Sequence, residues 1–177
     1  MSFHRSPLVV VSLLLLSCWI FGQREASPKA EERIQKEVRH ELLMLPNLTV
    51  FDNLAYKING YDVTLLGQVV NPVVKSDAGN SVKHIEGVEK VDNQIEVLPP
   101  SPMDSQLRRK LYRAIYGYPA LQRYAMPVIE PIRIIVKNGH VTLEGVVDSQ
   151  ADKDMITLRA KGVPGTFSVD NNLSVSK

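Results

Sequence analysis

The chain has 177 residues, with 21 Lys and Arg against 19 Asp and Glu and a formal net charge of +2 at pH 7. This length accommodates one large domain or two small ones of roughly 70 residues each. So mild a charge disfavours a nucleic-acid partner, and the single cysteine excludes a disulfide within the chain.

The N-terminal segment differs from the rest of the chain. A basic start, His4 and Arg5, leads into the apolar run 8–22, and charged residues resume at Arg24. This pattern predicts a secretory signal peptide over residues 1–26, since a membrane-spanning helix needs about 20 apolar residues. We therefore expect an exported protein of the periplasm. An uncleaved anchor is the alternative, because no A-x-A cleavage site follows the apolar run.

Cys18 lies inside this segment and has two interpretations. The sequence Leu15-Leu16-Ser17-Cys18 resembles a lipobox, in which the cysteine is lipidated and holds the protein on a membrane. Alternatively, Cys18 is a small apolar residue of the signal, because Trp19-Ile20-Phe21 prolongs the apolar run beyond it. Both leave the mature chain without thiol chemistry.

An internal repeat follows the signal. A shift of 78 positions places VTLLGQV on VTLEGVV and VDNQIEV on VDNNLSV, with twelve identities in the 35 positions of 63–97 against 141–175. The first helices match at a shift of 73, so the second copy carries a five-residue insertion. We predict a first domain at 28–98, a proline-rich linker at 99–102 and a second domain at 103–177.

Each copy shows the same order of elements. Ser27-Pro28 and Ser101-Pro102 are typical of a helix start, and apolar residues then recur at helical spacing. A hairpin follows, in which an Asn138-Gly139 turn pairs Ile134 with Leu143 in the second copy, and Tyr56 faces Leu65 in the first. A second helix, at about 73–86 and 150–162, leads to a last strand at 90–97 and 168–175. The connection through this helix is long enough for the last strand to pair in parallel with the preceding strand.

The predicted fold class is therefore α+β: two tandem αββαβ units, each a small three-stranded mixed sheet with two helices on one face. Within NGHVTLEG, the first glycine belongs to the hairpin turn, and the second marks a bulge or a close approach of a helix. No helix begins directly after these glycines, which argues against a phosphate-binding loop. The residues assigned to the repeated structural motif are Gly67, Gly87, Asn93, Gly139, Gly145, Gly165 and Asn171.

The repeated pattern of VTLLGQV with GVEKVDNQIEV, and of VTLEGVV with VPGTFSVDNNLSV, resembles the BON domain, named after bacterial OsmY and nodulation proteins. The resemblance covers both units and departs from the family at Thr166, where the usual residue is Val. It implies an exported envelope protein without catalytic activity that binds phospholipid or supports the envelope under osmotic stress. BON domains are also fused to other envelope proteins, so the fold alone does not determine the ligand.

Catalytic and metal-binding chemistry find no support in the residues. His40, His84 and His140 belong to different elements and have no carboxylate at ligand spacing. No nucleophile, zinc or paired-cysteine motif occurs, so we expect neither an enzyme nor a cofactor. An inward-facing asparagine, Asn93 or Asn171, must find hydrogen-bond partners, most simply in the backbone of the adjacent turn. A small-ligand pocket beside it is the alternative.

Charge separates the two copies. Residues 28–98 carry 8 basic and 11 acidic side chains, a net of −3, whereas residues 101–177 carry 11 and 7, a net of +4. Tyr112 and Tyr116 follow Arg108 at intervals of four, so the three line one flank of the predicted helix. Tyrosine and arginine together suit a headgroup interface. The predicted binding surface for an anionic phospholipid membrane comprises Arg108, Arg109, Lys110, Tyr112, Arg113, Tyr116, Tyr118, Arg123 and Tyr124.

Two other interpretations of this segment stay open. The same residues also fit a solvated helix face whose tyrosines cover the edge of the core. A protein-binding or chaperone-like module of the envelope would use the tyrosines and exposed strand edges on a protein partner.

Overall fold

The computed structural model describes residues 27–176 and contains two repeats of one order of elements. The signal peptide and Cys18, both predicted from residues 1–26, lie outside this range. The first repeat comprises α1 (Pro28–Leu43), β1 (Asn53–Asn59), β2 (Asp62–Val69), α2 (Pro72–Lys83), β3 (Lys90–Asn93) and β4 (Glu96–Val97). The second comprises α3 (Pro102–Tyr116), η1 (Pro119–Ala125), β5 (Ile132–Lys137), β6 (His140–Val147), α4 (Gln150–Lys161) and β7 (Ser168–Val175).

The first helix of each repeat begins where the Ser-Pro pairs predict. The side chains of Ser27 and Ser101 accept hydrogen bonds from the backbone N–H groups of Ala30 and Asp104. Each cap satisfies a donor that has no partner within its helix, and the proline that follows has no N–H to satisfy. The buried stripes are Ile34, Val38 and Leu42 on α1, and Leu107, Leu111 and Ile115 on α3.

The predicted hairpin registers are confirmed in both repeats. Ile134 pairs with Leu143 in the second, and Tyr56 pairs with Leu65 in the first. The Asn138-Gly139 turn has φ angles of 52° and 79°, the left-handed values that a two-residue type I′ turn requires.

The last strand of each repeat pairs in parallel with the middle strand, as predicted. In the second repeat it is one strand, and the sheet order is β5-β6-β7. In the first repeat the predicted strand 90–97 is instead broken into β3 and β4, both paired with β2. The side-chain contacts of the two repeats do not explain this difference.

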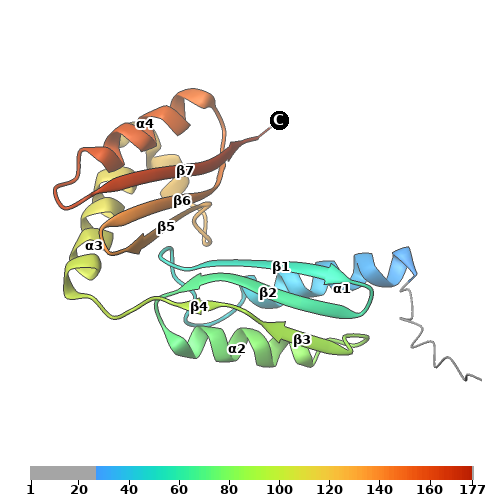
Figure 1. Cartoon of the computed structure of the whole chain (residues 1–177). Helices are drawn as coiled ribbons and strands as arrows, with labels where there is room; N and C mark the ends of the chain where they lie inside the picture. Colours follow the sequence, from blue (N-terminus) through green and yellow to red (C-terminus); the bar gives the residue numbers. More distant parts are fainter. Residues whose placement is uncertain (1–26, 177) are drawn as a thin grey trace, which may run out of the picture.

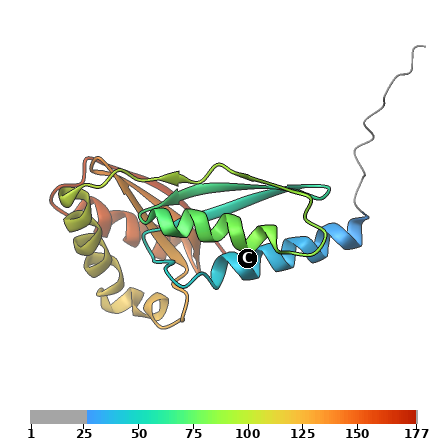
Figure 2. The same ribbon diagram turned by 90° about the horizontal axis from the view of Figure 1, so that it is seen from below.

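Each unit has its own core beneath one face of its sheet. In the first, α1 and α2 lie on the same side of the sheet (Figure 2) and their apolar residues pack on Val63, Leu65 and Val69. In the second, α3 and α4 pack on the inward residues of β5 and β6. The predicted arrangement of two helices on one face is therefore confirmed.

The short helix η1 was not anticipated by the sequence pattern. It follows α3 and packs Leu121 and Tyr124 into the second core, where they are 0% and 4% exposed. The larger second repeat thus uses its extra residues to close one end of its core.

The two units meet along the edge strands β1 and β5, which lie next to each other in Figure 1. The backbone N–H of Ile134 donates to the carbonyl of Val50 at 2.9 Å, and the Val50 side chain is buried in the core of the second unit. Lys137 forms an ion pair with Glu96 at 2.6 Å across the same boundary. Val50 therefore belongs to the first repeat in sequence and to the second core in packing, whereas Leu45 and Leu48 of the same segment pack in the first core.

Candidate lipid-binding surface

The structure separates the nine residues predicted for lipid binding. Arg108, Tyr116 and Tyr124 are 4%, 3% and 4% exposed, so they cannot contact a membrane surface. For these three residues the sequence interpretation is wrong, because their flank of α3 and η1 faces the protein interior.

Arg108 is directed at β5 instead of solvent. Its Nη2 donates to the carbonyl of Val136 at 2.6 Å, while its Nε has no hydrogen-bond partner within residues 27–176. Burial lowers the pKa of Arg108, and the nearby carboxylates of Asp104 and Asp52 oppose that effect. The Asp104 carboxylate itself accepts from the backbone N–H groups of the hairpin turn, at 2.9 Å from both Asn138 and Gly139.

Tyr112 and Tyr116 form part of the contact between the units. Their rings lie 4.9 Å apart, and the ring of Phe51 packs edge-on against Tyr112 at 6.3 Å. The Tyr116 hydroxyl donates to the carbonyl of Ile132 at 2.6 Å, and burial raises the pKa of Tyr116. Of these two residues predicted to lie at a membrane surface, Tyr112 therefore packs against Phe51 of the first unit and Tyr116 is bonded to β5.

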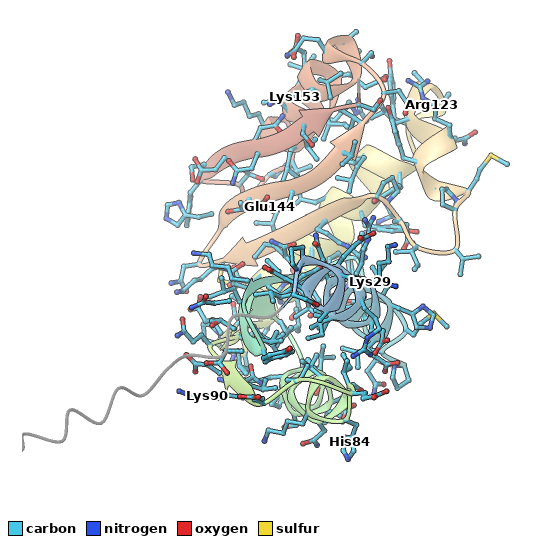
Figure 3. The ribbon with its side chains drawn as sticks, turned by 90° about the vertical axis from the view of Figure 1, so that its right-hand side faces the viewer. Lys29, His84, Lys90, Arg123, Glu144 and Lys153 are labelled. Carbon is cyan, nitrogen blue, oxygen red and sulfur yellow. The ribbon has the colours of Figure 1, made fainter. Side chains whose placement is uncertain are left out.

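Arg123 and Tyr124 hold η1 against the start of α4. Arg123 forms ion pairs with Asp148, at 3.0 Å, and with Asp152. The Tyr124 hydroxyl donates to Asp152 at 2.8 Å and accepts from the backbone N–H of Asp148 at 2.8 Å. Arg123 lies on the outer side of the second unit (Figure 3), but its charge is already neutralised by two carboxylates.

The remaining predicted residues, Arg109, Lys110, Arg113 and Tyr118, reach the surface to different degrees. Lys110, Arg113 and Tyr118 line a groove of about 650 Å³ between α3 and α4, and Arg109 is exposed outside it. We call this the α3–α4 groove.

Helix α4 supplies the rest of the groove. The Arg159 guanidinium lies 4.7 Å from the centre of the Tyr118 ring, and its Nε donates to the carbonyl of Ala114 at 3.1 Å. Leu158, which is 66% exposed, and half-buried Met155 add an apolar lining. Sequence reasoning overlooked all three α4 residues. The helical periodicity of the sequence could have identified two of them, because Met155 and Leu158 fall beside the buried stripe of Ile156 and Ala160.

The lining of the α3–α4 groove contains three cationic side chains, Lys110, Arg113 and Arg159, and no carboxylate. An arginine stacked on an aromatic ring gains a cation–π contact and leaves its other N–H groups free to bind an anion. Cations above an apolar lining suit a phosphate headgroup with its adjoining acyl chain.

The first unit has a groove at the corresponding place, about 580 Å³ in volume, between α1 and α2. Its lining contains Lys36, Glu37, His40, Glu41, Ser81, His84, Ile85 and Glu86. At the matched positions Glu37 replaces Lys110, His40 replaces Arg113 and Ser81 replaces Arg159, so the first groove has three carboxylates and one lysine where the second has three cations. His40 and His84 line this one groove, and no group of three or more potential metal ligands occurs in residues 27–176.

The two motif asparagines bind backbone, as the sequence favoured. Asn171 donates from Nδ2 to the carbonyl of Lys153 at 3.1 Å, and its Oδ1 accepts from the N–H of Leu173 at 2.9 Å. Asn93 makes the equivalent bonds to Lys75 and Ile95. The partner on the helix side is a carbonyl of α2 or α4 itself, so each asparagine ties a helix to the last strand.

The motif glycines all have positive φ angles, at Gly67, Gly87, Gly139, Gly145 and Gly165. At Gly145, an added Cβ would lie 1.9 Å from the carbonyl oxygen of Pro131, and at Gly67 it would lie 2.0 Å from that of Asn53. The close neighbour is thus the backbone at the start of the adjacent strand, so of the two alternatives predicted for Gly145, a bulge or a close helix, the close helix is wrong.

The family model of the BON domain matches residues 30–99 and again residues 104–177. The chain belongs to the BON domain family. BON domains are associated with phospholipid binding and occur in envelope and osmotic-stress proteins. Proteins that contain them are generally non-enzymatic. The tandem repeat deduced from the sequence is therefore confirmed.

Comparisons beyond the family model are distant. None of the curated proteins matches the chain significantly. Among solved structures, CdsD, a structural protein of the type III secretion system of Chlamydia trachomatis, shows 12% identity and a TM-score of 0.33, covering 81% of this chain and 92% of its own. The C-terminal domain of CdsD shows 13% identity and a TM-score of 0.33, covering 80% and 96%. No helix within residues 27–176 is long and apolar enough to cross a membrane.

Proposed function

We propose that the protein docks on anionic phospholipid membranes through the α3–α4 groove of its second BON unit. The observation that carries this proposal is the contrast between the two equivalent grooves. Lys110, Arg113 and Arg159 face the second groove without any carboxylate, whereas the first groove is lined by three glutamates and a single lysine, Lys36. An anionic surface attracts the former and repels the latter.

The location proposed for this activity is the periplasm, with the protein exported by the segment 1–26 and supporting the envelope under osmotic stress. Support comes from the apolar N-terminal run and from the envelope association of the BON family. Mass spectrometry of the protein isolated from its native cells would identify the mature N-terminus. A mature chain that begins at a lipidated Cys18 would identify a lipid anchor, and loss of that lipid in Cys18→Ala would verify it.

The test of docking is cosedimentation with vesicles of phosphatidylglycerol and phosphatidylcholine, against vesicles of phosphatidylcholine alone. Each cation near an anionic surface contributes about 1 kcal/mol. Reversing Lys110, Arg113 and Arg159 to Glu should therefore weaken binding to anionic vesicles by at least roughly 100-fold, while neutral vesicles should bind neither form.

The matched control reverses three exposed lysines of the first unit, Lys57, Lys83 and Lys90, to Glu. It changes the net charge by the same amount, and Lys90 lies on the side of the first unit away from the second (Figure 3). Binding should persist in this variant. An equal loss of vesicle binding in both variants would show that net charge alone, and not the α3–α4 groove, governs binding. Equal binding of the wild type to both kinds of vesicle would refute the proposal.

A second candidate function, docking on an envelope protein, is favoured by the loop after η1. Met126 and Val128 are 83% and 100% exposed, so two apolar side chains lie in solvent within one short loop. Under this alternative, Val128→Asp would abolish a stoichiometric crosslink to one envelope protein and leave vesicle binding unchanged.

A further inference from the structure

A separate concave site lies where the two units meet. It has a volume of about 280 Å³ and is bounded by the C-terminal part of α1, the segment leading into β1, and Arg133 of β5. We call it the junction pocket. It shares no residue with the α3–α4 groove.

Two cations from different units face this pocket. Arg39 is exposed on α1 and forms no ion pair within residues 27–176. Arg133 is held in place by the bond from its Nη1 to the carbonyl of Thr49 at 3.0 Å. A guanidinium carries five N–H donors in a planar fork, so this single bond leaves Arg133 donors for a ligand.

The one carboxylate of the pocket, Asp52, is committed to the protein backbone. It is 1% exposed and accepts from the N–H and hydroxyl of Thr49 at 2.8 and 2.6 Å, and from the N–H of Val70 at 2.7 Å. These bonds hold Asp52 in the turn before β1, so it cannot move to pair with Arg39. One fixed negative charge thus faces two positive ones.

Leucine side chains form the apolar part of the pocket, from Leu42, Leu43, Leu48 and Leu54. Arginines at an apolar cavity bind anions strongly, because a carboxylate or phosphate can take two parallel N–H bonds in a partly desolvated place. The volume is at the low end for ligand pockets. It accommodates one short alkyl chain and is too small for the two acyl chains of a phospholipid.

We propose that the junction pocket binds a single-chain anionic amphiphile, with the head group between Arg39 and Arg133 and the alkyl chain against the leucines. Because the walls come from both units, the bound amphiphile bridges them and holds their relative position. This activity is independent of docking on a membrane surface, since the α3–α4 groove takes no part in it.

The test is isothermal titration of the purified protein with decanoate below its micelle concentration. Arg39→Glu should weaken decanoate binding at least 10-fold. The matched control, Lys29→Glu, changes the same charge at the other end of α1 and should stay within twofold of the wild type. Arg133→Gln should weaken binding in the same way, and circular dichroism verifies that each variant is folded.

Two further ligands separate the contribution of the anionic head group to binding from that of the alkyl chain. Inorganic phosphate should bind much more weakly than decanoate, and decyltrimethylammonium should not bind. Equal affinity of the wild type and Arg39→Glu for decanoate, equal affinity for the cationic amphiphile, or no decanoate binding at all would overturn the proposal. The variant that reverses Lys110, Arg113 and Arg159 should bind decanoate as the wild type does. Loss of vesicle docking can therefore be distinguished from loss of decanoate binding.

Discussion

Replacement of Gly145 by alanine should destabilise the second unit more than any other alanine substitution at a glycine of that unit. Gly145 has a φ of +126°, and the added Cβ would lie 1.9 Å from the carbonyl oxygen of Pro131. An L-residue at this φ costs about 1–3 kcal/mol. The overlap with backbone adds about 1–3 kcal/mol, because no side-chain rotation can relieve it. The free energy of unfolding should therefore fall by about 2–6 kcal/mol.

Urea unfolding monitored by circular dichroism measures this change as a shift in midpoint at unchanged slope. Gly162→Ala is the matched control. Gly162 has a φ of −75°, and its added Cβ would meet nothing closer than the Leu158 carbonyl oxygen at 3.5 Å. We expect it to change stability by less than about 0.5 kcal/mol. Similar losses in both variants would refute the steric reasoning, as would a fully stable Gly145→Ala protein.

Two further predictions concern polar groups of the second unit. Asn171→Ala removes the bonds to Lys153 and Leu173 and should lower the free energy of unfolding by about 1–3 kcal/mol, whereas Asn172→Ala, an exposed neighbour, should have little effect in the same urea assay. Burial raises the pKa of Asp152, but hydrogen bonds, including those from Tyr124 and Arg123, outweigh it and lower that pKa below 3.8. Its ionised form therefore stabilises the fold above that value, and this contribution is lost as the pH falls through the lower folded pKa. Urea midpoints from neutral pH down to acid should consequently fall less steeply for Asp152→Asn than for the wild type, and parallel curves would contradict this assignment.

Most of the fold could be predicted because its signals are local and occur twice. The Ser-Pro caps, the period-two alternation around Asn138-Gly139 and the crossover helices each depend on neighbours within a few residues. The repeat then tested every assignment against a second copy, which is why the strand registers were correct. The helix η1 escaped notice because only one copy contains it.

The candidate site could be predicted only in part. Periodicity placed Arg108, Tyr112 and Tyr116 on one flank of α3, which is correct, but it could not identify the neighbour of that flank. Strand β5 accepts the hydrogen bonds of Arg108 and Tyr116, and Phe51 of the other unit packs on Tyr112. These contacts between segments distant in sequence bury the flank. Conversely, Arg159 joins Lys110 and Arg113 only because α4 packs beside α3, a contact between elements more than 30 residues apart.

The sequence by itself determined the elements common to both repeats, the hairpin registers and the division into two units of opposite charge, since these follow from local spacing and composition. Only the tertiary structure decided which charges are available to a partner. Helix packing exposes Lys110 and Arg113 and buries Arg108 on the same helix, and the meeting of the two units brings Arg39 and Arg133 to one pocket. Exposure and convergence depend on contacts between distant segments, and those contacts exist only in the folded chain.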